Sequence, residues 1–392
     1  PCETVLLANF FLRSTHMVDN VGRHMEQIRV REQKDQEGEA RQMIERENGR
    51  FNIEGQPEER FTLQQLQGLN DLSKLETIGS GTFAEMVKKS VYTPRGIDVA
   101  VKIVRIFDRP GGKNEGRGDE DMVRETSNTR RAAHENVVWL YGFVVDKQAC
   151  YMCMELMQAN LDEVKKVVHG QSGLHVERRL GPEDREEFIG CVAVAVVDGL
   201  AFLRNNARVM HRDIKPNNIM INDRGQVKIC DFGVSKRLQT VLSSTRANTA
   251  GIGCIRYMAP EQFSAEVRTV GYGHKAGVWS LAISLHEFAT GRNAYEGVSD
   301  FLIADDVTTK DSPKLTRETG FGVDLRNFID ACLFKDESER ASLRPDDGNC
   351  LQDKKFYKVH VNRGAEARKE NVIDVLNMAT THLSTLRKGL DR

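Results

Sequence analysis

Cysteine is scarce in this chain, which has eight cysteines among 392 residues. That density is too low for a small fold held together by disulfides. Cys150 and Cys153 stand at the spacing of a metal-binding pair, but no second pair and no nearby histidine complete a zinc site. We therefore expect reduced thiols and an intracellular protein, located in the cytoplasm, with the nucleus as a second candidate location.

The sequence also lacks an excess of either charge and any long apolar run. Lysine and arginine total 56 against 57 aspartates and glutamates, a net charge of −1, which argues against a general binder of nucleic acid or membrane surfaces. The longest apolar stretch, 188–203, is broken by Gly190 and Asp198 and is shorter than the roughly 18 residues of a membrane helix. Residues 5–12 are apolar but too few for a signal peptide.

Four parts can be distinguished along the chain. Residues 1–72 contain a stretch rich in arginine, glutamate and glutamine with few apolar positions, typical of a solvated helix or a partly ordered extension. Residues 73–157 contain short β-branched runs and glycines, helical patterns dominate 158–358, and 359–392 form a C-terminal region. The predicted fold class is α+β, with a small β-rich lobe before a larger, mainly helical lobe.

The β-rich lobe is expected to hold an antiparallel sheet. Its predicted strands are Leu75–Ile78, Met86–Val91, Asp98–Val104, Val137–Val145 and Ala149–Leu156. A glycine-rich connector, 109–121, leads to a predicted helix at Met122–Ala133. In the larger lobe Pro182 suits the first turn of a long helix, and the acidic residues after it complement the positive end of the helix dipole.

Two segments of this sheet have the residues of a phosphate site. The run Gly79-Ser80-Gly81-Thr82-Phe83-Ala84 lies between two strands, where glycines let backbone N–H groups approach phosphates closely. Further on, Val99-Ala100-Val101-Lys102 is an apolar strand that carries one lysine. Lys102 is either an edge-strand charge or a cation that holds phosphates. Each segment alone leaves both interpretations open.

A denser motif lies at His211-Arg212-Asp213-Ile214-Lys215-Pro216-Asn217-Asn218, and Asp231-Phe232-Gly233 follows it. Phosphoryl transfer needs a carboxylate to orient the incoming hydroxyl, oxygen ligands for Mg²⁺, and cations near the moving phosphoryl group. These groups are supplied by Asp213, Asn218, Asp231 and Lys215. Aspartate and asparagine are also ordinary turn residues, but the number of specified positions disfavours that interpretation.

These motifs resemble the protein kinase family, over residues 73–358. The resemblance implies a bilobal protein kinase fold and the use of ATP and Mg²⁺. It also implies that Asp213 is the catalytic base and that Lys215 places a charge on the γ-phosphate. Asn218 and Asp231 would be the metal ligands. A lysine two residues after Asp213 resembles the serine/threonine type of catalytic loop.

The resemblance also assigns the nucleotide site. Lys102 would hold the phosphates and pair with a glutamate on the next helix, for which Glu125 is preferred over Glu115 and Glu120. Met154 would be the gatekeeper beside the adenine. The other nucleotide contacts implied by the resemblance are Ile78, Gly79, Ser80, Gly81, Thr82, Met86, Ala100, Glu155 and Met157.

Further details resemble a MAP kinase kinase of the stress-activated branch. They include Cys153-Met154-Glu155-Leu156-Met157, Cys230 directly before Asp231, Gly233-Val234-Ser235 and Trp279-Ser280-Leu281-Ala282-Ile283-Ser284-Leu285. The resemblance is greatest to the kinases that activate c-Jun N-terminal kinases, and it implies transfer to threonine and tyrosine of a MAP kinase activation loop. An upstream MAP kinase kinase kinase and a scaffold protein are implied as partners. Glu261 would pair with Arg340 at the end of the activation segment.

Thr245 and Thr249 resemble the family's pair of phosphorylation sites. Phosphates there would each add about −1.5 to −2 charge, and Arg212 is the expected partner that orders the loop. The alternative is that these threonines are merely two of several hydroxyl groups in the loop. After Leu238 the loop is also longer than the family pattern.

Three further features each have two interpretations. Cys230 would lie beside the nucleotide, as a reactive thiol or as a buried, inert one. The segment Arg23-His24 with Ile28-Arg29-Val30 resembles a MAP kinase docking motif or marks an ordinary amphipathic helix. The apolar pattern beyond Val361 predicts a C-terminal helix, which either docks upstream kinases, as the resemblance implies, or packs on the large lobe.

The chain departs from the kinase pattern at several positions. They are Ala84 for the third glycine, Met86 for the valine that covers adenine, Thr129 for a large apolar residue, Gly277 for an aspartate and Ala341 for a proline. That aspartate usually accepts hydrogen bonds from the catalytic loop, and losing such a buried acceptor costs about 1–3 kcal/mol. No reacting group is removed, but these departures leave an alternative function open: a weakly active or inactive scaffold that links an upstream kinase to a MAP kinase.

Overall fold

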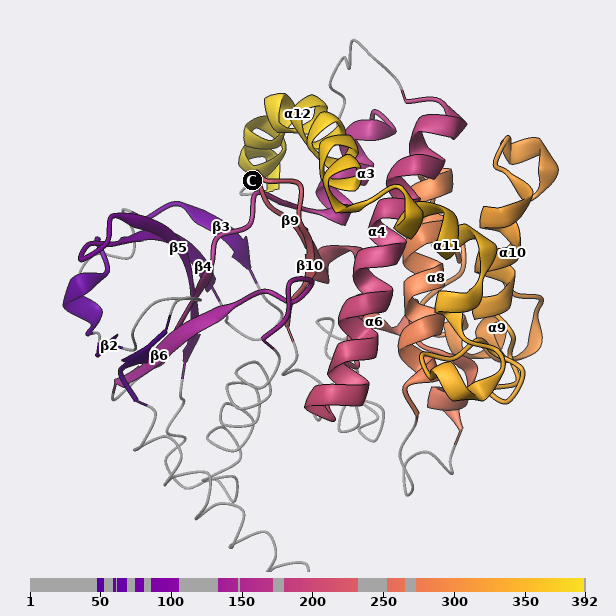
Figure 1. Ribbon diagram of the computed structural model, residues 1–392, viewed down its shortest axis with the longest axis horizontal. Helices are drawn as coiled ribbons and strands as arrows, with labels where there is room; N and C mark the ends of the chain where they lie inside the picture. Colours follow the sequence, from indigo (N-terminus) through magenta and orange to yellow (C-terminus); the bar gives the residue numbers. More distant parts are fainter. Residues whose placement is uncertain are drawn as a thin grey trace, which may run out of the picture.

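The computed structural model of the chain describes residues 48–52, 59–60, 62–68, 75–80, 86–105, 133–146, 149–171, 180–231, 252–264 and 273–390. The described chain forms a β-sheet lobe from its earlier part and a helical lobe from the rest (Figure 1). This arrangement confirms the predicted α+β class. Within these ranges, no helix combines the length and the apolar character of a membrane span.

The smaller lobe is built on an antiparallel sheet. Across the described residues its strands follow the order β2-β1-β6-β7-β5-β4-β3. Their bounds are β1 Arg50–Phe51, β2 Glu59–Arg60, β3 Thr77–Ser80, β4 Met86–Tyr92, β5 Ile97–Arg105, β6 Leu140–Asp146 and β7 Ala149–Glu155. Alternation along β5 sends Val99, Val101 and Ile103 into one packed layer with Tyr92, and places Lys102 on the opposite face.

The predicted strands are confirmed to within a few residues, with one informative difference. Strand β6 begins at Leu140, not at the predicted Val137. Val137 instead forms a bridge with Ile229, and the N–H of Val138 donates to the carbonyl of Ile229 at 3.0 Å. The segment before β6 therefore binds the larger lobe. Of the predicted helix Met122–Ala133, all but the last residue lies outside the described part of the chain.

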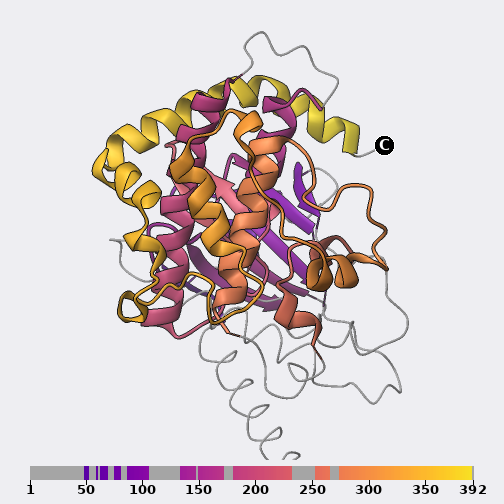
Figure 2. The same ribbon diagram turned by 90° about the vertical axis from the view of Figure 1, so that its right-hand side faces the viewer.

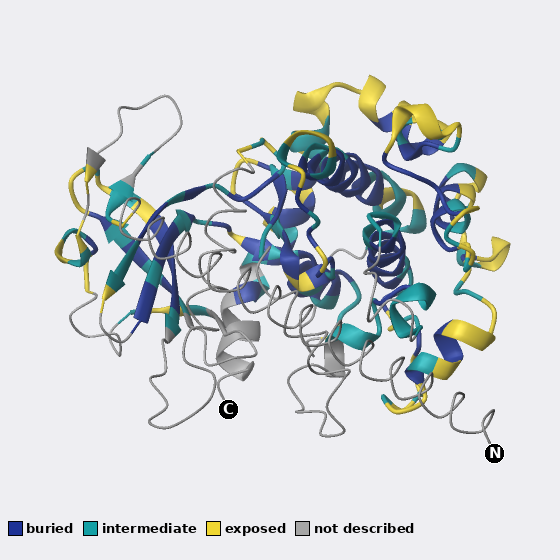
Figure 3. Ribbon diagram, turned by 90° about the horizontal axis from the view of Figure 1, so that it is seen from below, coloured by how far each residue is buried: buried dark blue, intermediate teal, exposed yellow. Residues whose placement is uncertain are grey.

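The larger lobe consists of helices packed around two central ones, α4 and α8. The helices are α3 Leu161–Val168, α4 Pro182–Phe202, α6 Ile252–Ile255, α8 Lys275–Thr290, α9 Ile303–Thr309, α10 Val323–Cys332, α11 Lys355–Asn362 and α12 Ala365–Leu390. The π-turn η3 is Leu203–Ala207, and the 3₁₀ turns are η1 Leu63–Gln65, η4 Pro216–Asn218, η6 Pro260–Phe263, η7 Arg317–Thr319, η8 Pro345–Asp347 and η9 Leu351–Asp353. A small antiparallel sheet contains β8 Ala159–Asn160, β9 Ile219–Ile221 and β10 Val227–Ile229. Buried segments gather inside this lobe and exposed residues on its outer helices (Figure 3).

Two glycines of the central helices, Gly190 inside α4 and Gly277 in the first turn of α8, should respond oppositely to alanine. A Cβ on Gly190 of α4 would lie 2.1 Å from the His360 ring of α11, whereas a Cβ on Gly277 of α8 would meet nothing closer than Leu200 at 3.9 Å. Gly190→Ala should therefore destabilise the lobe by about 1–3 kcal/mol through overpacking. Gly277→Ala should stabilise it by up to about 1 kcal/mol, because alanine favours helices. Thermal unfolding without nucleotide measures both, and equal shifts of one sign would contradict the packing argument.

His274, which precedes α8, should make the helical lobe sensitive to acid. Burial and, next, the nearby positive charge of Arg204 together lower its pKa to about 4. In the unfolded chain this imidazole becomes protonated near pH 6.5, whereas in the folded chain it becomes protonated only near pH 4. Stability is therefore complete above pH 6.5 and falls as the pH drops through this window. We expect His274→Gln to reduce the fall in unfolding temperature between pH 7 and pH 5. Between pH 7.5 and pH 8.5 the pH dependence of the unfolding temperature should be the same in the variant and the wild type.

The C-terminal helix α12 packs on the larger lobe. It lies against α3 and α4 and runs along one edge of the lobe to the C-terminus (Figure 2). Its apolar face is buried there, through Val372, Val375, Leu376, Ala379 and Leu383. Gly225, in the turn between β9 and β10, lies so close that a Cβ would be 2.3 Å from the carbonyl oxygen of Lys369. The predicted helix is thus confirmed, and its apolar residues pack on the lobe; a docking role would have to use its other faces.

Candidate active site

The predicted catalytic loop brings its three polar residues into one hydrogen-bonded group. The ammonium of Lys215 lies 2.7 Å from Oδ2 of Asp213. The side-chain amide of Asn218 donates to the same oxygen at 2.9 Å and to the backbone carbonyl of Asp213 at 2.8 Å. The 3₁₀ turn η4, with Pro216 in its first position, sets this spacing. Two donors therefore hold the Asp213 carboxylate in one orientation.

A residue that the sequence reasoning missed completes this group. The Lys215 ammonium donates to the Cys254 sulfur of α6 at 3.1 Å. Burial raises the pKa of Cys254, as does the nearby Asp213 charge, so the thiol stays protonated. Burial disfavours the charged form of Lys215, but attraction to the Asp213 carboxylate is stronger, so the pKa of Lys215 is raised. The available sequence signal was the position of Cys254 seven residues before Glu261, which was predicted to lie at the end of the activation segment.

Lys102 and Asp231 form an ion pair between the two lobes. Lys102 is almost fully buried and its ammonium contacts Oδ1 of Asp231. Burial would raise the pKa of Asp231, but the Lys102 charge outweighs it and lowers the pKa, so the carboxylate stays ionised. Asp231 has a φ of +70°, in the left-handed region that favours glycine. The predicted partner of Lys102, Glu125, lies outside the described residues.

The donor chemistry at this point suits a hard divalent cation. The backbone N–H of Cys230 donates to the carbonyl of Asn218 at 3.0 Å, so Asn218 and Asp231 lie next to each other. Their amide and carboxylate oxygens are ligands that Mg²⁺ prefers, with phosphate oxygens and water completing its shell. No group of three or more histidine, cysteine, aspartate or glutamate side chains placed to hold a metal occurs in the described ranges. The residues fit a cation that arrives with a nucleotide.

The predicted nucleotide contacts lie on β3, β5 and the end of β7. Ala100 pairs with Met154 across β5 and β7. Ala100 and Lys102 share one face of the sheet because one residue separates them. Met157 is buried just after β7. Strand β3 contains Ile78, Gly79 and Ser80, whereas Gly81 and Thr82 lie outside the described residues.

The register of β4 differs by one residue from the predicted alignment. Met86 pairs with Ile103, and Val87 pairs with Lys102. Cross-strand partners share a face, so Val87, one residue after the predicted Met86, joins the face that carries Lys102. Pairing of β4 with β5 is regular from Met86 to Tyr92, and the irregularity lies between β3 and β4 at Thr77 and Gly79, which motif spacing cannot reveal.

The Glu155 side chain binds residues of the helical lobe. Its Oε2 accepts from Lys228 of β10 at 2.7 Å, and both residues are buried. Its Oε1 accepts from Asn222 at a longer 3.4 Å. The backbone of Glu155, and not its carboxylate, is therefore the part that a nucleotide could contact.

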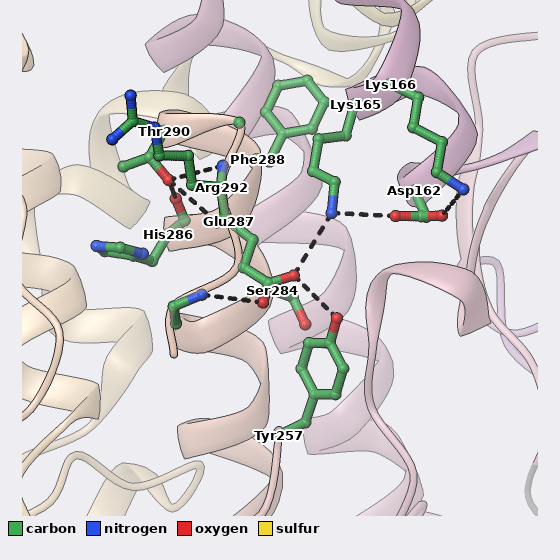
Figure 4. A network of polar contacts seen from close by, with 12 residues as sticks. Asp162, Lys165, Lys166, Tyr257, Ser284, His286, Glu287, Phe288, Thr290 and Arg292 are labelled. Carbon is green, nitrogen blue, oxygen red and sulfur yellow. Dashed lines mark hydrogen bonds and ion pairs between the residues drawn. The ribbon is translucent and has the colours of Figure 1, made fainter. Parts of the chain in front are cut away.

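The end of the activation segment is fixed by two charged networks. The predicted pair of Glu261 and Arg340 is confirmed, with hydrogen bonds of 2.7 and 2.8 Å, and Arg340 is fully buried. In the second network the Tyr257 hydroxyl donates to Glu287 of α8 at 2.9 Å, and the Lys165 ammonium of α3 lies 3.5 Å from the same carboxylate (Figure 4). Burial raises the pKa of Glu287. These contacts hold the segment that contains Tyr257 and Glu261 to the helical core.

The predicted phosphorylation sites, Thr245 and Thr249, lie outside the described residues. Cys230 is described, and burial together with the Asp231 charge raises the pKa of its thiol. The structure therefore favours the inert interpretation of Cys230, because a neutral thiol is a poor nucleophile.

Comparison with known proteins agrees with the fold and the site. The protein kinase domain matches residues 72–350, well over half of the chain. The chain therefore belongs to the protein kinase family.

Its relatives include the dual specificity mitogen-activated protein kinase kinase SEK-1 of Caenorhabditis elegans, 34% identical over 69% of this chain and 75% of the relative. The chain is also similar to human dual specificity mitogen-activated protein kinase kinase 7, at 35% identity over 69% of this chain and 60% of the relative. Hemipterous of Drosophila melanogaster, a third dual specificity mitogen-activated protein kinase kinase, is 34% identical over 76% of this chain and 23% of its own length. The chain thus spans less than two thirds of some relatives.

Proposed function

We propose that this protein kinase is a dual specificity MAP kinase kinase of the stress-activated type. It transfers the γ-phosphoryl group of ATP to a threonine and a tyrosine in the activation loop of a c-Jun N-terminal kinase. An upstream kinase switches it on by phosphorylating Thr245 and Thr249, and a scaffold protein holds the cascade together in the cytoplasm, with the nucleus as a second site. The observation that carries the proposal is the Asp213 carboxylate, held by Lys215 and Asn218 beside the Lys102–Asp231 pair.

The residues divide the work of phosphoryl transfer. Lys102 binds the nucleotide phosphates, and Asn218 and Asp231 would hold Mg²⁺, which would offset phosphate charge. Asp213 accepts the proton of the substrate hydroxyl as that oxygen bonds to the γ-phosphorus and the bond to ADP breaks. Lys215 offsets the charge on the transferred group. Because Lys102 pairs with Asp231, the two side chains must part for Lys102 to bind phosphates and for Asp231 to hold a cation.

A second candidate function is a catalytically inactive scaffold. The observation that favours it is Gly277, which has no side chain where the kinase pattern places an acceptor for the catalytic loop. Leu200 is the nearest neighbour to that position at 3.9 Å. The intact Asp213 group favours the enzyme over this alternative.

Phosphate transfer from radiolabelled Mg·ATP to a kinase-dead c-Jun N-terminal kinase tests the proposal. The full chain carries Thr245→Glu and Thr249→Glu, and the same chain with Asp213→Asn is the control. Labelling of threonine and tyrosine that depends on Asp213 is the expected result. Absence of labelling by a folded chain that still binds the MAP kinase would favour the scaffold.

A further inference from the structure

An added strand, residues 48–52 with β1 at its centre, lies between β2 and β6 and covers the edge of β6. Residues 48–52 pair with β6 in antiparallel register, with Phe51 opposite Gly142. The N–H of Gly49 donates to the carbonyl of Phe143 at 2.9 Å, and the N–H of Asn52 donates to the carbonyl of Tyr141 at 2.7 Å. Backbone groups that an edge strand would otherwise leave to solvent are thus paired.

Trp139 joins this added strand to the connection between the lobes. Its indole Nε1–H donates to the carbonyl oxygen of Asn52 at 3.1 Å. Its own carbonyl accepts from the N–H of Glu155 at 2.9 Å, and its N–H faces Oε2 of Glu155 at 3.5 Å. Trp139 therefore contacts the added strand through its side chain and the end of β7 through its backbone.

The same contacts continue to the metal-binding side of the cleft. Oε2 of Glu155 also accepts from Lys228 at 2.7 Å, and both groups are buried. Lys228 belongs to β10, which ends two residues before Asp231. Val138, next to Trp139, donates to the carbonyl of Ile229 in the same strand. A short path of hydrogen bonds thus runs from Asn52 through Trp139 and Glu155 to β10, the strand that precedes Asp231.

We propose that Trp139 is a positioning residue for the nucleotide, held in place by the strand at 48–52. Trp139 binds Glu155, which is itself one of the predicted nucleotide contacts and has two others, Met154 and Met157, close to it in sequence. A fixed indole keeps the backbone at Glu155 in one position, so the site is formed before ATP arrives. The inference rests on the proposed use of ATP. It assigns to the residues before the kinase domain a role in nucleotide affinity that is separate from phosphoryl transfer.

Trp139→Phe tests this role, because it keeps an aromatic ring and removes the indole N–H. The expected result is a three- to tenfold rise in KM for ATP, and in Kd for Mg·ATP measured by titration calorimetry, with kcat changed less than twofold. Asn52→Pro removes the donor to Tyr141 and leaves the Asn52 carbonyl in the chain. It should raise the same KM without lowering kcat, which provides a second route to the result if one variant folds poorly.

Asn48→Ala is the matched control. Its side-chain oxygen accepts from the N–H of Val145 at 3.0 Å, at the end of the same pairing that lies away from Trp139. This variant removes one side-chain hydrogen bond and leaves the backbone pairs of Gly49 and Asn52 with β6 in place, so its KM for ATP should equal that of the wild type. A wild-type KM in Trp139→Phe would overturn the inference, as would an equal rise in Asn48→Ala. A wild-type chain that fails to bind Mg·ATP would instead count against the proposed function.

Discussion

Replacing Asp213 with asparagine should lower kcat for phosphoryl transfer by about 10²–10⁴-fold, the usual contribution of a general base. The amide has the size of the carboxylate, so the contacts with Lys215 and Asn218 can persist in the variant. It cannot take the hydroxyl proton, however, because an amide oxygen is a very weak base. KM for ATP should change less than twofold, since Asp213 does not hold the nucleotide.

Steady-state transfer to the kinase-dead MAP kinase measures kcat, and titration with Mg·ATP measures nucleotide affinity. Asp223→Asn is the matched control, because Asp223 is exposed in the turn between β9 and β10. It removes the same charge away from the cleft and should leave both quantities unchanged. A loss of less than tenfold in Asp213→Asn would show that Asp213 is not the base.

The largest effect on stability is expected from breaking the Glu261–Arg340 pair. Arg340 is fully buried, forms two hydrogen bonds with Glu261, and donates through Nε to the carbonyl of Phe334 at 2.9 Å. Its guanidinium also lies 5.2 Å from the centre of the Trp279 ring. Glu261→Gln leaves a buried positive charge without its partner, which costs about 3–5 kcal/mol.

Urea unfolding followed by a signal from the helical lobe measures this loss. Arg344→Met is the control, because Arg344 is half exposed and its 3.6 Å pair with Asp347 is worth less than about 1 kcal/mol. The double variant Glu261→Gln with Arg340→Met should lose less than the sum of the two single variants, since neither charge is then left alone. Strict additivity would mean that the two side chains do not stabilise each other.

The chemistry of the site was predictable because it is concentrated in short segments. Asp213, Lys215 and Asn218 lie within six consecutive positions, so local backbone geometry alone brings them together. Strand β5 was equally visible, since its β-branched residues Val99, Val101 and Ile103 recur at every second position and are buried. The Glu261–Arg340 pair is distant in sequence, and the family resemblance supplied it.

Motif spacing did not predict the contacts that cross between elements. Cys254 reaches Lys215 only because the end of the activation segment folds back over the catalytic loop. The pairing of Val87 with Lys102 depends on the register of β4 against β5, and a shift of one changes the face of every side chain.

For this protein, residues close in sequence specified the reacting groups, the α+β class and the kinase family. The tertiary structure decided which distant groups meet. The helix α12 packs its apolar face on α3 and α4, and Glu155 pairs with Lys228. Trp139 connects residues 48–52 to the end of β7. The physical reason is that periodicity and local spacing constrain the backbone over a few residues. Pairing between remote strands and burial of remote charges depend instead on the packing of the whole chain.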